Sequence, residues 1–286
     1  MRPKKRSMVE AILRVFSVLP LRVNHLIGSL VGRYLYLTNT ESRRVVMANI
    51  ELCFPDMSPQ DMKILVKKNL IETGKGLTES GPIWFNDFAV NSKCVKEING
   101  ADNLESDKPI ILLVPHFGCW EITGRVLSLV RPVTFLYKPL KRRYFEKLLF
   151  SRRQQGGLDM AAADKKGVIK IQRAINSNKV IGILPDQDPG EEGSVMAPFF
   201  NHKVRTMTLL VRLARKHDAT VLLTWAERLH QGKGYKLNLK KINVVSEENT
   251  LESDVGLMNH EIENLIKTNP EQYLFNYKRF KSILKY

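Results

Sequence analysis

The sequence predicts one α/β domain with a mixed central sheet flanked by helices, preceded by a helical N-terminal segment. Short apolar runs rich in β-branched residues alternate with stretches of helical periodicity over most of the chain. Such alternation is typical of a layered fold in which helices cover both faces of a sheet. The 286 residues contain no repeat and no low-complexity linker, and 43% of them are hydrophobic, so one sizeable core can form.

Residues 1–37 form the first predicted unit, a helical segment at a membrane interface, and residues 38–286 form the second. A spanning helix needs ~20 mostly apolar residues, but charged residues and Pro20 interrupt the apolar stretch at 8–37. No small-residue cleavage site follows a clean apolar run, which argues against a signal peptide. A basic, interrupted amphipathic segment suits the surface of an anionic membrane. The alternative is an ordinary pair of core helices broken at Pro20. The basic residues that open the segment are Arg2, Lys4, Lys5 and Arg6.

The remaining elements follow in chain order. Helical patterns fill the first 85 residues, with a helix start at Ser58, which can cap, and Pro59, which fits a first turn. Two closing helical stretches are expected on either side of Pro270. Further helices are predicted at 167–176 and 206–217, and strands at 93–98, 109–115, 132–137, 179–184, 219–225 and 235–245.

The charge balance indicates an anionic partner. The chain has 45 basic and 29 acidic residues, a net charge of +16, which attracts nucleic acid, anionic lipid or acidic proteins alike. The three cysteines, Cys53, Cys94 and Cys119, are widely spaced and form no Cys-x-x-Cys pair, so we expect no disulfide framework and no zinc site.

His116 and Glu121 are the predicted catalytic pair. They flank a turn, with Gly118 between them, directly after the apolar run 110–114. A carboxylate that accepts from one imidazole nitrogen fixes the tautomer and stabilises the imidazolium, so the other nitrogen can act as a general base. The alternative is a half-buried histidine at a strand end. Cys119 is read as a small buried side chain rather than a nucleophile.

Asp186 and Asp188 flank one residue after the strand predicted at 179–184. Three interpretations stay open at this point: a turn closing on Pro189-Gly190, a metal or nucleotide site, and another kind of substrate site. A basic cluster contains guanidinium groups suited to phosphates and oxyanions, although most of its members are expected to be solvated. Its members are Lys138, Lys141, Arg142, Arg143, Lys147, Arg152 and Arg153.

Six motifs in order resemble the bacterial lipid A biosynthesis acyltransferases, within the lysophospholipid acyltransferase group. The resemblance covers nearly the whole chain and includes the His-x-x-x-x-Glu block at His116. The other motifs are Arg43-Arg44 with Asn49 and Phe54-Pro55, Tyr137-Lys138 with Arg153, Asp186-Gln187-Asp188 with Gly190, Pro198-Phe199-Phe200 with Thr206, and Pro270-Glu271-Gln272-Tyr273 with Arg279-Phe280-Lys281.

The resemblance implies a glycerolipid-acyltransferase-like fold and an enzyme on the cytoplasmic face of the bacterial inner membrane. Such an enzyme transfers a fatty acyl chain from acyl carrier protein to a hydroxyl of an acylated, phosphorylated glucosamine-disaccharide lipid. It uses no cofactor and no metal. The residues implied to bind substrate are Arg153, Asp186, Asp188, Lys138 and Arg279.

On this scheme His116 takes the hydroxyl proton, Glu121 orients His116, and Arg153 or backbone N–H groups after His116 stabilise the oxyanion. A long apolar tunnel should hold the acyl chain. Three other functions compete: a glycerolipid acyltransferase, a glycosyltransferase using Asp186 and Asp188 with a metal, and a noncatalytic binder of nucleic acid or anionic membranes. Nucleic acid is not expected as a partner, because basic and aromatic residues are not interleaved as in RNA-recognition modules.

Overall fold

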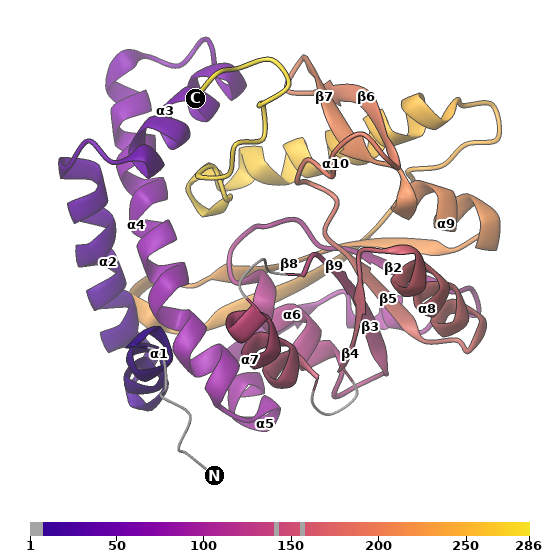
Figure 1. Ribbon diagram of the computed structural model, residues 1–286, viewed down its shortest axis with the longest axis horizontal. Helices are drawn as coiled ribbons and strands as arrows, with labels where there is room; N and C mark the ends of the chain where they lie inside the picture. The colour runs from indigo at the N-terminus through magenta and orange to yellow at the C-terminus, as the bar shows by residue number, and fades with distance from the viewer. Residues whose placement is uncertain (1–7, 140–142, 155–157) are drawn as a thin grey trace.

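The computed structural model describes residues 8–139, 143–154 and 158–286, and confirms the predicted α/β class. Its centre is a seven-stranded mixed sheet in the order β1-β9-β8-β2-β5-β3-β4, with a separate β6-β7 hairpin (Figure 1). Strand β9 runs antiparallel to β8 and parallel to β1, whereas β8, β2, β5, β3 and β4 are all parallel neighbours. The strands are β1 (Val95–Asn99), β2 (Ile110–Leu113), β3 (Val133–Tyr137), β4 (Leu158–Ala162), β5 (Val180–Ile183), β6 (Ser194–Phe199), β7 (His202–Met207), β8 (Thr220–Arg228) and β9 (Tyr235–Ile242).

Helices cover both faces of the sheet because successive strand side chains point to opposite sides. On β2, Ile111 and Leu113 belong to the core shared with α8, α9 and α10, whereas Ile110 and Leu112 belong to the core shared with α5 and α6. The helices are α1 (Met8–Val18), α2 (Leu21–Leu37), α3 (Glu41–Cys53), α4 (Pro59–Phe85), α5 (Phe88–Ser92), α6 (Trp120–Leu127), α7 (Arg143–Arg153), α8 (Lys165–Asn176), α9 (Leu209–His217) and α10 (Leu251–Thr268).

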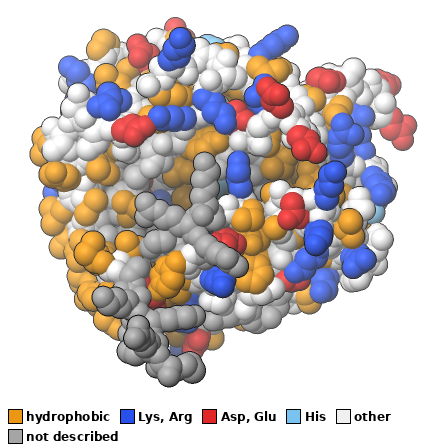
Figure 2. Space-filling view, in the orientation of Figure 1, with side chains coloured by type: hydrophobic (Ala, Val, Ile, Leu, Met, Phe, Trp, Pro, Cys, Tyr) orange, Lys and Arg blue, Asp and Glu red, His pale blue; other side chains and the backbone are white. Residues whose placement is uncertain are grey.

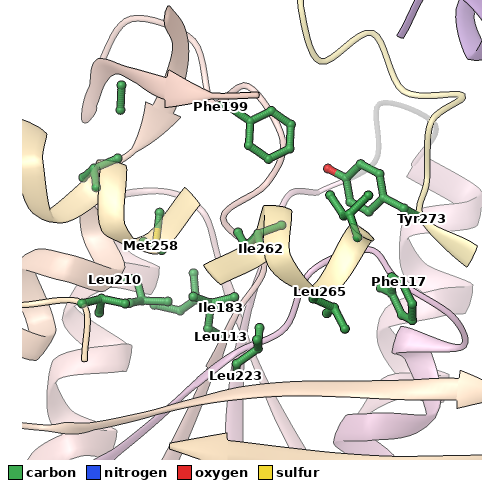
Figure 3. Packing of buried hydrophobic residues seen from close by; sticks show 14 of the residues in the cluster. Leu113, Phe117, Ile183, Phe199, Leu210, Leu223, Met258, Ile262, Leu265 and Tyr273 are labelled. Atoms are coloured by element: carbon green, nitrogen blue, oxygen red, sulfur yellow. The ribbon is translucent and has the colours of Figure 1, made fainter. Parts of the chain in front are cut away.

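Helix α10 closes the first of these cores. Figure 3 shows its side chains Met258, Ile262 and Leu265 facing the strand residues Leu113 and Ile183. All five are at most 5% exposed, so the inner strands of the sheet are held rigidly on this side. A rigid strand end is what a precisely placed catalytic side chain requires.

The sequence analysis missed several elements of the structure and predicted others wrongly. The predicted strands correspond to β1, β2, β3, β5, β8 and β9, but β4, α7 and the β6-β7 hairpin were not expected. Helix α9 begins at Leu209, because 202–207 pairs with β6 instead. The prediction of a second closing helix after Pro270 is wrong. After a short 3-10 turn at Pro270–Gln272, the chain pairs with the loop that follows β2. Backbone hydrogen bonds from this segment to the loop after β2 take the place of the hydrogen bonds that a helix would form within itself.

The N-terminal helix α2 packs on α4 almost backbone to backbone (Figure 1). A side chain on Gly74 of α4 would meet the carbonyl oxygen of Gly28 at 2.0 Å, and one on Gly32 would meet that of Leu70 at 2.3 Å. Only glycine permits this approach, so the sequence itself fixes how α2 docks. No helix among the described residues is both long and apolar enough to cross a membrane. The basic residues before Met8 lie outside the described part of the chain.

Candidate active site

His116 and Asp186 meet at one edge of the sheet. Each follows a buried strand, β2 or β5, and these strands are parallel neighbours, so their carboxyl ends lie together. The Asp186 carboxylate accepts from the backbone N–H of His116 at 2.9 Å and contacts ring Nδ1 at 2.8 Å. Burial alone raises the pKa of Asp186, but the adjacent His116 outweighs it and holds that pKa below its usual value. Asp186 is therefore an ionised anchor for the ring.

The far nitrogen of His116 faces the reaction space. With Nδ1–H donating to Asp186, Nε2 carries a lone pair, and the Gln187 amide donates to it at 3.2 Å. This amide marks the position from which a substrate hydroxyl would donate its proton. The geometry is compatible with a general base, and among the described residues no serine or cysteine side chain forms a hydrogen bond with the His116 ring.

The turn after His116 is fixed by the C-terminal segment. Gly118 has a left-handed backbone (φ +57°), and a side chain there would meet the Ala226 carbonyl oxygen at 2.0 Å. Its N–H donates to the Gln272 carbonyl at 2.9 Å, and the Leu274 N–H donates to the His116 carbonyl at 3.0 Å. Segments more than 150 residues apart in sequence thus hold one short turn.

Behind this turn lies a buried ionic cluster. Arg228 donates to the Gly118 carbonyl at 2.8 Å and forms a fork with the Glu79 carboxylate at 2.6–3.0 Å. His25 of α2 and Tyr235 of β9 contact the same carboxylate at 3.1 and 3.0 Å. Burial raises the pKa of Glu79, but Arg228 more than reverses this and lowers it to about 2. The cluster joins the N-terminal helices to the catalytic turn.

Glu121 has partners other than the one the sequence indicated. Its carboxylate accepts from both Nε (3.1 Å) and Nη2 of Arg153 and from the Trp84 indole N–H at 3.2 Å. Asp186, not Glu121, holds the His116 ring, so the predicted orienting role of Glu121 is wrong. The physical reason is strand order: Asp186 reaches Nδ1 from the neighbouring strand end, while Glu121 faces α7. Burial raises the pKa of Glu121, but Arg153 outweighs it and the pKa stays below its usual value.

His116, Glu121 and Arg153 all line one cavity of about 990 Å³. Its walls are largely apolar and come from α6, β3, α7, β4, α8, α9 and the loop that follows β5. Phe135 of β3 and Leu158 and Met160 of β4 supply one part of the apolar wall, and Val168 and Ile169 of α8 supply another. The volume lies at the upper end of the range for small-molecule sites. The site thus combines His116, the half-buried guanidinium of Arg153 and a large, mostly apolar space.

The remaining predicted site residues separate into two groups. Lys138 and Asp188 line the cavity, whereas Arg279 is buried outside its lining, where it donates to the Arg205 carbonyl at 2.5 Å and to Thr206 at 2.7 Å. Asp188 accepts from the Gly190 N–H at 2.8 Å, so the predicted turn is formed there. Lys141 and Arg142 of the basic cluster lie outside the described residues.

Cys119 is buried, at 2% exposure, and does not line the cavity. Burial raises the pKa of its thiol well above the usual value, so the thiolate needed for attack is disfavoured. This confirms the reading of a buried side chain. The three backbone N–H groups after His116 donate to Pro115, Gln272 and Ala226. They are therefore occupied, which leaves Arg153 as the stronger oxyanion candidate of the two.

Sequence reasoning missed four residues of the site: Gln187, Trp84, Glu79 and Arg228. Gln187 lies inside the Asp186-Gln187-Asp188 motif, so its position was a usable signal. Glu79 of α4 and Arg228 of β8 lie 149 residues apart, and neither element carries a local motif. Only the tertiary fold brings them together.

Comparison with known proteins identifies the family of the chain. A family model described as bacterial lipid A biosynthesis acyltransferase matches residues 3–282. The lipid A biosynthesis lauroyltransferase of Escherichia coli K12 is 30% identical over 270 residues, 92% of this chain and 87% of that protein. The palmitoleoyltransferase of the same organism is 28% identical, covering 95% and 89%, and its myristoyltransferase is 23% identical, covering 88% and 79%. The chain therefore belongs to the bacterial lipid A biosynthesis acyltransferase family and is an O-acyltransferase.

Proposed function

We propose that this enzyme transfers a fatty acyl chain from acyl carrier protein to a hydroxyl of an acylated, phosphorylated glucosamine-disaccharide precursor of lipid A. The observation that carries the proposal is the His116–Asp186 pair beside a large, mostly apolar cavity in a chain of this family. A base whose ring, within the described part of the chain, contacts no serine or cysteine side chain suits direct attack by a substrate hydroxyl.

His116 performs the proton transfer in this scheme. Its Nε2 takes the proton of the acceptor hydroxyl as that oxygen bonds to the thioester carbonyl carbon. The carbon–sulfur bond then breaks, and the departing thiolate takes the proton from His116, which returns to its starting form. Asp186 holds Nδ1–H throughout and stabilises the transient imidazolium. No acyl-enzyme forms.

Arg153 stabilises the negative charge that develops on the carbonyl oxygen. Its guanidinium is half-buried at the cavity wall, where an ionic interaction is worth more than in bulk water. Glu121 keeps this guanidinium in place through a two-pronged contact. Glu121 is therefore a positioning residue in the proposal, and it acts on the oxyanion side through Arg153 rather than on His116. Asp188 and Lys138 are proposed to contact substrate at the cavity wall.

The apolar walls hold the acyl chain of the donor. Each buried methylene contributes about 0.8 kcal/mol, so a few carbons change affinity by an order of magnitude or more. Three exposed cations, Lys138, Lys165 and Arg212, line the same cavity. They can pair with an acidic carrier protein or with the phosphate of its prosthetic arm. A donor of this kind also places the reaction on the cytoplasmic face of the inner membrane.

A direct assay tests the proposal. Purified enzyme is mixed with an acyl carrier protein thioester and the disaccharide lipid acceptor, and the product mass is measured. We expect a gain of one acyl chain, lost in His116→Ala and kept in His260→Ala, which removes an exposed histidine of α10. Transfer to a lysophospholipid but not to the disaccharide would instead identify a glycerolipid acyltransferase. Equal activity of the two histidine variants would contradict the mechanism.

We also propose that residues 1–37 hold the enzyme at the membrane surface. Helix α2 buries polar residues and exposes apolar ones. Asn24 and His25 are buried, whereas the side chains of Leu26, Leu30 and Leu37 are exposed, with an exposed fraction of 77% for Leu37. Figure 2 shows hydrophobic side chains gathered along the edge formed by α1 and α2. An apolar stripe of this kind on a basic protein fits the headgroup region of an anionic bilayer.

Vesicle binding tests this surface. Replacing Leu26 and Leu30 together by Glu should abolish most sedimentation with anionic vesicles, since each leucine buried in lipid contributes about 1–2 kcal/mol. Leu257→Glu, at an exposed position of α10, is the matched control and should bind as wild type does. High salt should release part of the bound protein because the basic residues are screened. Unchanged binding by the double variant would contradict the proposal.

A further inference from the structure

The large cavity has an arm on the α6 side of the sheet. Alternate side chains of a strand point to the same face, and Phe135, Leu158 and Met160 line the cavity from the face whose core includes α6. Opposite them, Glu121 and Gly124 line the cavity about one turn apart on α6. The arm therefore runs between α6 and the strands β3 and β4.

The strand register shows how far this arm reaches from the catalytic edge of the sheet. Tyr137 lies at the carboxyl end of β3, and Phe135, two residues earlier, pairs with Met160. Leu158 of β4 is two residues deeper again and pairs with Val133. At about 3.3 Å per residue, Leu158 lies roughly 13 Å below the level of Tyr137. Val133 is buried and does not line the cavity, so the arm ends at the level of Leu158.

The ring of Phe135 closes this end of the arm between two glycines. A side chain added at Gly124 of α6 would meet the ring at 2.9 Å, and one added at Gly182 of β5 would meet it at 2.4 Å. The ring therefore fills the gap between the helix and the sheet, and the exposed fraction of Phe135 is only 8%. A side chain at Gly124 would also meet Leu158 at 3.3 Å, so helix and strands converge there.

The acyl chain of the donor enters this arm in the proposed mechanism. Its carbonyl oxygen is stabilised by Arg153, which Glu121 holds. Glu121 precedes Gly124 by about one turn on the face of α6 that lines the cavity. The chain attached to this carbonyl therefore runs along α6 towards Phe135. Carbon atoms beyond the ring would find a close-packed core with no space for them.

We propose that Phe135 and Gly124 form a stop that limits the length of the donor acyl chain. This rests on the proposed function and adds the residues that set its donor specificity. A chain that is too short leaves apolar space unfilled, and one that is too long must displace the ring, so one length is preferred. Each buried methylene changes affinity about fourfold, so a difference of two methylenes should change donor preference by roughly 10- to 20-fold.

Competition between donors tests the stop. Two acyl carrier protein thioesters that differ by two methylenes compete in one tube, and the product masses give the ratio of their kcat/KM values. Phe135→Leu leaves part of the gap between the glycines open and should shift this ratio roughly tenfold towards the longer donor. Gly124→Ala adds one methyl group at the end of the arm and should shift it about fourfold towards the shorter donor. Phe199→Leu loses the same atoms from the core on the other face of the sheet and should keep the wild-type ratio.

Three results would overturn the stop. They are an unchanged ratio in Phe135→Leu, an equal shift in Phe199→Leu, and a shift towards the longer donor in Gly124→Ala. A ratio measured in one tube does not depend on the folded fraction, so a loss of stability does not imitate a shift. Each enzyme is assayed with the disaccharide lipid and with a lysophospholipid. Transfer to the lysophospholipid alone would contradict the proposed function but would still report the donor ratio, which separates the two failures.

Discussion

Two carboxylates, one buried and one half-buried, flank the same turn, yet they are held for different tasks. Asp186, at the end of β5, contacts an imidazole ring and a backbone N–H, whereas Glu121, at the start of α6, contacts a guanidinium and an indole N–H. Both have a pKa below the usual value, so both are ionised at neutral pH. The partner decides the role: one carboxylate serves proton transfer and the other positions a cation.

The largest effect should come from Asp186→Asn. The amide cannot stabilise an imidazolium and can favour the wrong ring tautomer, so kcat should fall about 10²–10⁴-fold with little change in the donor KM. Steady-state kinetics with the disaccharide acceptor measures this. If Asp186→Asn kept near wild-type kcat, the distinction between the two carboxylates would collapse.

Glu121→Gln should cost less, roughly 10- to 100-fold in kcat, because Arg153 remains but is held less firmly. Removing an oxyanion donor outright costs about 10²–10³-fold, so Arg153→Ala should be the more severe variant of this pair. Arg153→Lys is the informative comparison, since a point charge cannot reproduce the forked contact. A Glu121 variant slower than the Asp186 variant would reverse the ranking that the contacts predict.

The buried ionic cluster around Glu79 and Arg228 should affect the free energy of unfolding rather than the catalytic rate. The pKa of Glu79 is depressed to about 2 from an ordinary 4.5. Its contribution is therefore fully present above about pH 4.5 and is lost as the pH falls toward 2, by about 3 kcal/mol. Urea unfolding at several pH values measures this.

Glu79→Gln is the variant that isolates this contribution. It should be less stable at pH 7, because Arg228 is left buried without its partner, and its stability should change less between pH 5 and pH 2. Glu248→Gln, at an exposed position, is the control and should follow the wild-type curve. A Glu79 variant with the full acid-dependent loss would show that other groups cause it.

The smallest effect should come from Cys119→Ala. The thiol is buried, outside the cavity, and has a raised pKa. Activity should stay within a few-fold of wild type, with a modest loss of stability from the smaller side chain. A covalent acyl adduct on Cys119, detected by mass spectrometry of the intact protein, would replace direct transfer with a two-step mechanism.

The sequence predicted most of the sheet but only half of the contacts at the site. Continuous apolar runs predict buried strands such as those at 110–114 and 179–184. Strand β4 was missed because Asp159 and small residues dilute its pattern, and α7 because its many charges looked like a solvated cluster. Neither strand's sequence indicates that β2 and β5 are neighbours in the sheet. The contact between His116 and Asp186 could therefore not be derived from the sequence. The choice of Glu121 as partner followed sequence proximity instead.

The most direct measurement of the central claim is the mass of lipid A from cells that carry either the wild-type gene or its His116→Ala variant in place of it. The account predicts that the variant strain lacks one acyl chain on lipid A, while the protein is present at normal levels. The missing mass also identifies the donor chain. Lipid A of identical mass in the two strains would contradict the assignment of His116 and, with it, the proposed reaction.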